Sequence, residues 1–245
     1  MPQNKTYTPT YKLKQFGENI WIVDGGEIIS FYGLPFTTRM TIIKLPNGDL
    51  WIHSPINLPA ELKQEIDNLG TVKHIIAPNK IHYWYIDEFK SAYPSATVYA
   101  SPGVRKRAAK YKPKIHFDKD LIGTNPATWK NQIEQVFIEG SRFMDEVVFF
   151  HKISKTLVVT DFIENFEASK INPFFRVIAW IGGALHPNGG TTIDQQLAFL
   201  GNRKKLQSSV QKILEFEIEK IILAHGKCIT KNGKEEFLRI VKWTR

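Results

Sequence analysis

The sequence predicts a mixed α/β fold in which two β-sheets face each other and helices cover both outer faces, a four-layer αββα sandwich. Three observations lead to this prediction. Residues 19–53 form short alternating runs separated by turns, as antiparallel strands do. Residues 50–110 then alternate strand and helix patterns, which indicates parallel strands with right-handed crossovers. The remaining chain is again mixed, and two such halves bury both sheets between helices.

The antiparallel start is divided by turn residues. Asp24-Gly25-Gly26 predicts a turn, and Pro46-Asn47-Gly48-Asp49 predicts a hairpin. Gly33-Leu34-Pro35 breaks the run between them. We therefore expect strands over 19–23, 28–32, 38–44 and 50–53, after a loose lead-in over residues 1–18.

The pattern then changes to the helical period. Pro59 suits the first turn of a helix and Gly70 its end, which predicts a helix over 59–69. A strand over 72–77 is ended by Pro78, which lacks an N–H and disfavours helix for the residue before it. Next we expect a helix over 87–93, a strand over 97–100 and a basic helix over 104–110.

The second half predicts a smaller set of strands and helices. Strands are expected over 133–138, 146–151, 156–160 and 218–224, and helices over 191–200, 204–216 and 234–243. The aromatic and glycine-rich stretch 162–190 is expected to cap the site. Residues 19–245 are expected to form a single domain.

Size and charge limit the possible classes of protein. The chain has 245 residues, 42% of them hydrophobic, one cysteine, Cys228, and a net charge of +9. No apolar run reaches the length of a membrane span, and the single cysteine fits a reducing compartment, so we expect a cytoplasmic protein. The charge favours an anionic partner. The basic clusters lack the aromatic pattern of nucleic-acid readers, so nucleic acid is not expected, and the oligomeric state is left open.

Four polar residues are expected at strand ends on one rim of the fold. They are His53, His82, Asp161 and His225. In open α/β sheets, ligands bind beyond the carboxyl ends of the strands. Imidazoles with a carboxylate suit zinc, iron or manganese, and an open position would activate a bound water. Each residue also has a structural alternative: His53 in a turn, His82 in the core, Asp161 as a cap, and His225 bonded to Asp161.

Three further residues are candidates for contact with a small-molecule substrate. Asn79 follows the strand that ends at Pro78, and Tyr83 and Trp84 begin an aromatic group that could line an apolar pocket. Aromatic stripes more often belong to a core, and Asn is a poor metal ligand that more often bridges backbone groups. Both alternatives remain open from the sequence.

The order of elements and several motifs resemble the metallo-β-lactamase-like superfamily from about Asn19 to the C-terminus. The closest similarity is to an uncharacterised branch often described as a domain of unknown function. The resemblance implies the αββα fold, one or two metals, most often zinc, and hydrolase activity in many members. It depends on Leu50-Trp51-Ile52-His53-Ser54-Pro55, Ala77-Pro78-Asn79 with His82, Tyr93-Pro94 with Tyr99-Ala100, the segment from Ser154 to Asp161, and Ala224-His225-Gly226.

The chain departs from the superfamily signature His-x-His-x-Asp-His. Its four ligand positions fall on Asn79, Ile81, Tyr83 and Trp84, none of them a good zinc ligand. The later histidine falls on Ser141, whereas Asp161 and His225 are retained.

Two interpretations follow from these losses and retentions. The first is a degenerate metallo-hydrolase with at most one divalent metal, acting on an ester, amide or phosphoester, with His82, Asp161 and His225 as catalytic residues. The second is a non-catalytic protein that has lost the metal site and binds a ligand or a partner.

Overall fold

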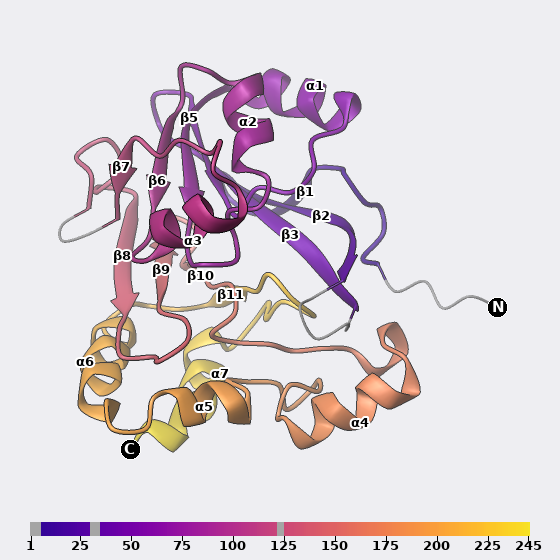
Figure 1. Ribbon diagram of the computed structural model, residues 1–245, viewed down its shortest axis with the longest axis vertical. Helices are drawn as coiled ribbons and strands as arrows, with labels where there is room; N and C mark the ends of the chain where they lie inside the picture. Colours follow the sequence, from indigo (N-terminus) through magenta and orange to yellow (C-terminus); the bar gives the residue numbers. More distant parts are fainter. Residues whose placement is uncertain (1–5, 30–34, 122–124) are drawn as a thin grey trace.

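The computed structural model describes residues 6–29, 35–121 and 125–245. Two β-sheets are stacked face to face, and helices lie on their outer sides (Figure 1). This is the predicted four-layer αββα arrangement.

The larger sheet, sheet A, has seven strands in the order of the chain. They are β1 (Lys14–Gly17), β2 (Ile20–Ile29), β3 (Pro35–Lys44), β4 (Asp49–His53), β5 (Thr71–Ala77), β6 (Thr97–Ala100) and β7 (Lys119–Asp120). The pairs from β1 to β4 are antiparallel, and those from β4 to β7 are parallel. The carboxyl ends of β4, β5 and β6 therefore meet at one edge.

Three amphipathic helices cover the outer face of sheet A: α1 (Ala60–Leu69), α2 (Ile86–Ala92) and α3 (Val104–Tyr111). They bury residues such as Leu62, Ile66 and Phe89 against Ile52 and Ile75 of the sheet. Removing such side chains from water contributes about 1.5–3 kcal/mol each.

The smaller sheet, sheet B, has four strands in the order β11-β10-β9-β8. They are β8 (Ile133–Ile138), β9 (Glu146–His151), β10 (Thr156–Val158) and β11 (Lys220–Ile222). β10 is antiparallel to β9 and parallel to β11. The second helical layer contains α4 (Pro173–Ile181), α5 (Ile193–Ala198), α6 (Arg203–Leu214) and α7 (Gly233–Ile240), with 3₁₀ turns η1 (Ala168–Lys170) and η2 (Lys242–Thr244).

An aromatic core lies between the two sheets. Trp51 of β4 meets Phe149 of β9 edge to face at 4.8 Å, and Trp129 packs against Tyr99 at the same centroid distance. All four side chains are at most 2% exposed. This packing fixes the strand ends of sheet A relative to those of sheet B.

Several predicted boundaries differ from the structure. Asp24-Gly25-Gly26 is not a turn: β2 runs through it with a bulge between Asp24 and Glu27, and a Cβ on Gly25 would collide with Thr38. β1 lies within the predicted lead-in, β7 was not predicted, and 162–190 contains the helix α4. The predicted strand over 28–32 and the break at 33–35 fall largely outside the described residues.

Within the described ranges, none of the helices has the length and apolar character needed to cross a membrane.

Candidate metal centre

Three strand ends bring His82, Asp161 and His225 together. His82 follows β5 of sheet A, Asp161 follows β10, and His225 follows β11 of sheet B. Within the described part of the chain, these three are the group whose possible ligand atoms all lie within 4.8 Å of one another. Sheet A thus contributes His82, and sheet B contributes Asp161 and His225.

Asp161 lies between the two imidazoles. Its Oδ2 is 3.2 Å from His82 Nε2, and its Oδ1 is 3.3 Å from His225 Nε2. The three side chains are only 6–9% exposed. Water therefore screens their mutual electrostatic interactions weakly.

Local turn chemistry places His82. Pro78 ends β5, and the Asn79 side-chain oxygen then accepts the backbone N–H groups of Ile81 (2.8 Å) and His82 (3.0 Å). This Asx-type turn directs the chain back toward sheet B. The Asn79 amide nitrogen donates to Asp161 Oδ2 at 2.5 Å and to Thr160 Oγ1 at 2.9 Å.

Hydrogen bonds on the far side of each imidazole determine which nitrogen carries the proton. His225 Nδ1 lies 2.8 Å from the Thr37 carbonyl, which can only accept, so Nδ1 is the protonated nitrogen. His82 Nδ1 lies 2.6 Å from Ser54 Oγ, which itself donates to the Arg39 carbonyl. When the rings are neutral, Nε2 of each therefore carries the lone pair, the arrangement found in metal-ligating histidines. When a ring is protonated, Nε2 instead donates to Asp161.

A second carboxylate holds the turn that carries Asp161. Glu146, 3% exposed at the start of β9, accepts the backbone N–H groups of Thr160 (2.6 Å), Asp161 (2.8 Å) and Phe162 (3.1 Å). Burial, followed by the nearby Asp161 charge, raises the pKa of Glu146 despite these bonds. Glu146 thus fixes the backbone of residues 160–162, and its carboxyl oxygens are engaged by these three N–H groups.

The ionisation of Asp161 and His82 reflects their close contact. Burial alone would raise the pKa of Asp161, but the charge of His82 and hydrogen bonds from both histidines outweigh it and hold that pKa below its usual range. Burial lowers the pKa of His82, yet Asp161 and then Glu146 raise it overall. The site is therefore built around an ionised carboxylate.

His53 is not part of the described group whose ligand atoms lie within 4.8 Å of one another. His53 stacks on Trp51 at 5.5 Å and meets the edge of Phe149, and its Nε2 has no hydrogen-bond partner among the described residues. Burial, and then the charge of His82, lowers its pKa to about 3. The ring lies in the inter-sheet core, and a metal-ligand role for His53 stays a prediction.

The predicted substrate-contact residues lie at different depths. Asn79 is fully buried behind Asp161, and Tyr83 is 1% exposed in the core beneath α2, whereas Trp84 is 44% exposed. Contact with a substrate stays a prediction for all three. Trp84 alone has the accessibility for it without movement.

Sequence reasoning missed the residues that orient the site. Thr37, Ser54 and Glu146 each contact a site residue from another strand, and their spacing along the chain carries no motif. Ser54 has φ of 54°, unusual for a residue other than glycine. The only signal in the sequence was its position directly after His53.

Comparison with solved structures identifies the fold. The chain matches the metallo-β-lactamases from Hirschia baltica (14% identity, TM-score 0.64, 96% of this chain and 97% of that one) and Pontibacter korlensis (13%, 0.64, 95% and 98%). It also matches FIM-1 from Pseudomonas aeruginosa, solved in its mono-zinc form (11%, 0.63, 95% and 94%). The protein therefore has the metallo-β-lactamase fold.

The chain belongs to the family described as Domain of unknown function (DUF4336), whose model matches residues 17–174. The expected metallo-β-lactamase fold and the expected family of unknown function are both confirmed. No curated protein matches the chain.

Proposed function

We propose that this protein is a metallo-β-lactamase-like hydrolase that holds one divalent metal, zinc, iron or manganese, on His82, Asp161 and His225. The observation that carries the proposal is the hydrogen bond from His225 Nδ1 to the Thr37 carbonyl. It leaves the Nε2 lone pair beside a carboxylate oxygen, which is unfavourable for a neutral ring unless a cation lies between the two.

The spacing of the ligand atoms fits this role. Two ligands about 2.1 Å from a tetrahedral zinc stand roughly 3.4 Å apart. Each nitrogen here lies 3.2 or 3.3 Å from a different Asp161 oxygen, and one ligand atom from each of the three residues falls within 4.8 Å of the others. Two imidazoles and one carboxylate are a donor set used by zinc, iron and manganese. The fourth position would remain for water or substrate.

A bound metal would supply a Lewis acid and lower the pKa of a coordinated water toward about 7. The residues of the chain supply orientation. Thr37 and Ser54 fix the two rings, and Asn79 and Glu146 fix Asp161. A small ester, amide or phosphoester is the proposed substrate class, with Trp84 as the accessible aromatic contact.

Metal content and thermal melting test the proposal. We expect about one metal per chain by elemental analysis and, at about 100 times the dissociation constant, a rise in melting temperature of roughly 5–10 °C. His225→Ala should abolish the rise, whereas His116→Ala should not, because the His116 side chain is 77% exposed. Absence of metal from the wild type, with no shift by zinc, iron or manganese, would refute the metal site.

Hydrolysis is tested separately with nitrophenyl acetate, a nitroanilide and bis-nitrophenyl phosphate. Turnover above background that His225→Ala removes supports the enzyme. If the protein binds metal but hydrolyses none of the three test substrates, the proposed metal site stands and the proposed hydrolase activity is refuted.

One observation favours the alternative of a non-catalytic ligand- or partner-binding protein. Asp161 Oδ2 already accepts the Asn79 amide at 2.5 Å, and the same oxygen faces His82. A protonated His82 paired with this carboxylate would satisfy the site without a metal. The melting experiment separates the two, since an ion pair alone gives no metal-dependent shift.

A further inference from the structure

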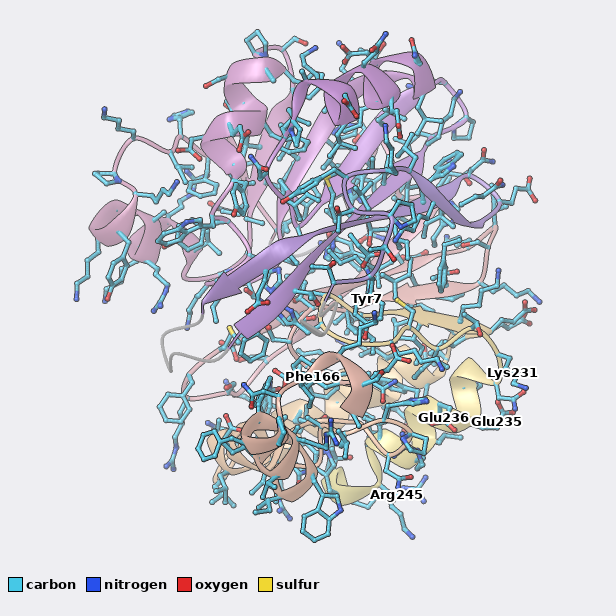
Figure 2. The ribbon with its side chains drawn as sticks, turned by 90° about the vertical axis from the view of Figure 1, so that its right-hand side faces the viewer. Tyr7, Phe166, Lys231, Glu235, Glu236 and Arg245 are labelled. Atoms are coloured by element: carbon cyan, nitrogen blue, oxygen red, sulfur yellow. The ribbon has the colours of Figure 1, made fainter. Side chains whose placement is uncertain are left out.

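Helix α4 exposes an unusual number of large apolar side chains. Its inner side packs through Phe175 and Ala179 into a small core that includes Phe166. Figure 2 labels Phe166 beside this helix. On its outer side Phe174 is 72%, Trp180 70% and Ile181 61% exposed, and the same surface includes Val177 and Ile178. A water-soluble helix normally carries polar residues on such a face.

The exposed surface continues onto α5. The Ile193 backbone N–H donates to the Gly182 carbonyl at 3.0 Å, so α5 begins where α4 ends. α5 and the turn after it add three further exposed side chains: Ile193, Leu197 and Leu200. We call these eight side chains of α4, α5 and the following turn the α4–α5 face.

Basic residues flank the α4–α5 face. Arg203, Lys204 and Lys205 are exposed at the start of α6, and only Gly201 and Asn202 separate them from Leu200. Figure 1 shows α4, α5 and the start of α6 along the same side of the molecule. Between residues 173 and 205 there are four basic residues and one acidic residue, Asp194. Lys205 pairs with Glu139 at 2.6 Å, which leaves the excess positive charge mainly on the other cations.

We propose that the α4–α5 face docks on an anionic lipid bilayer, with its aromatic and aliphatic side chains in the interfacial region and Arg203 and Lys204 at the headgroups. Tryptophan and phenylalanine prefer that region, and nearby Lys and Arg strengthen binding to anionic lipid. α4, with 9 residues, is too short to span a bilayer. The protein therefore lies on the surface.

Charge complementarity favours lipid over a second copy of the chain. A symmetric dimer through this face would use the same patch on both subunits. Its two basic flanks would then lie close to one another with few acidic residues to compensate them. An anionic bilayer instead compensates the charges of Arg203 and Lys204.

Vesicle co-sedimentation of the full chain tests the proposal. We expect binding to vesicles of phosphatidylcholine and phosphatidylserine in equal parts, and much weaker binding to phosphatidylcholine alone. Phe174→Ser with Trp180→Ser should lower the affinity about a hundredfold, at least about tenfold for each buried ring. Ile153→Ser, an exposed apolar residue in the β9–β10 turn, should leave it unchanged.

A double charge-reversal variant tests the electrostatic part of the proposal independently. Arg203→Glu with Lys204→Glu should lower affinity at least about twentyfold, and added salt should weaken wild-type binding. The matched control is Lys106→Glu with Lys114→Glu, the same charge change around α3 on the opposite helical layer. Because all four are exposed, these variants are expected to fold.

Three results would overturn the proposal. The first is no binding to the mixed vesicles. The second is equal loss of binding in the Lys106/Lys114 control. The third is a concentration-dependent dimer in analytical ultracentrifugation that the Phe174/Trp180 variant abolishes, because it would assign the face to a second copy.

Discussion

Replacing Glu146 by alanine tests how the candidate metal centre is held in place. The carboxylate accepts three backbone N–H groups, those of Thr160, Asp161 and Phe162, in a setting that is 3% exposed. A buried donor left without an acceptor costs about 1–3 kcal/mol. With partial relaxation, Glu146→Ala should lower the free energy of unfolding by roughly 3–6 kcal/mol, a large share of the 5–15 kcal/mol typical of a domain.

Urea unfolding followed by circular dichroism and fluorescence measures this loss. Glu146→Gln keeps the volume and one acceptor oxygen, so we expect about half the effect. Glu139→Ala is the control: its pairing with Lys205 is exposed, and such pairs contribute about 0–1 kcal/mol. A Glu146→Ala variant within about 1 kcal/mol of wild type would show that the turn carrying Asp161 does not depend on this carboxylate.

Three other perturbations have defined outcomes. Arg39→Met should cost less than about 3–5 kcal/mol in urea unfolding, because buried Asp24 loses its ion pair with Arg39 but keeps the one with Lys14, and adding Asp24→Asn should recover part of the loss. Burial lowers the pKa of His74 and of His151 to about 4, so the unfolded chain takes up these protons first and stability should fall as the pH drops from about 6.5 to 4. At pH 5 the loss should be about 2 kcal/mol per histidine, and His151→Gln should remove its share from a pH series of unfolding curves. Gly226→Ala should lower the melting temperature by several degrees, since φ is 89° and a Cβ would collide with a neighbouring backbone carbonyl.

Regular elements were predictable from the sequence because their signals are local. The strand ending at Pro78 and the alternation from 50 to 110 depend on period and on proline and glycine positions. The bulge at Asp24-Gly25-Gly26 was not predictable in this way: the same residues form turns, and only pairing with β3 selects the bulge. α4 was not predicted, although Asn172 and Pro173 at its start are both helix-start signals in the sequence.

For the candidate site, the sequence predicted which residues lie at the ends of strands, but not which way their side chains point. His82, Asp161 and His225 lie together because their strands end at one edge. His53 also ends a strand, yet its side chain packs against both Trp51 and Phe149 in the inter-sheet core. Which of the two faces a strand-end side chain takes depends on register, and a shift of one residue reverses it.

The three proposed ligands come from opposite halves of the sandwich, His82 from the first sheet and the other two from the second. Any ion coordinated by all three residues would link the two sheets to each other. Opening of the sandwich at that edge would then require release of the ion, so amide hydrogen exchange in β5 and β10 should slow together when it binds. Binding of the ion would therefore change the hydrogen-exchange rates of backbone amides in both halves of the sandwich.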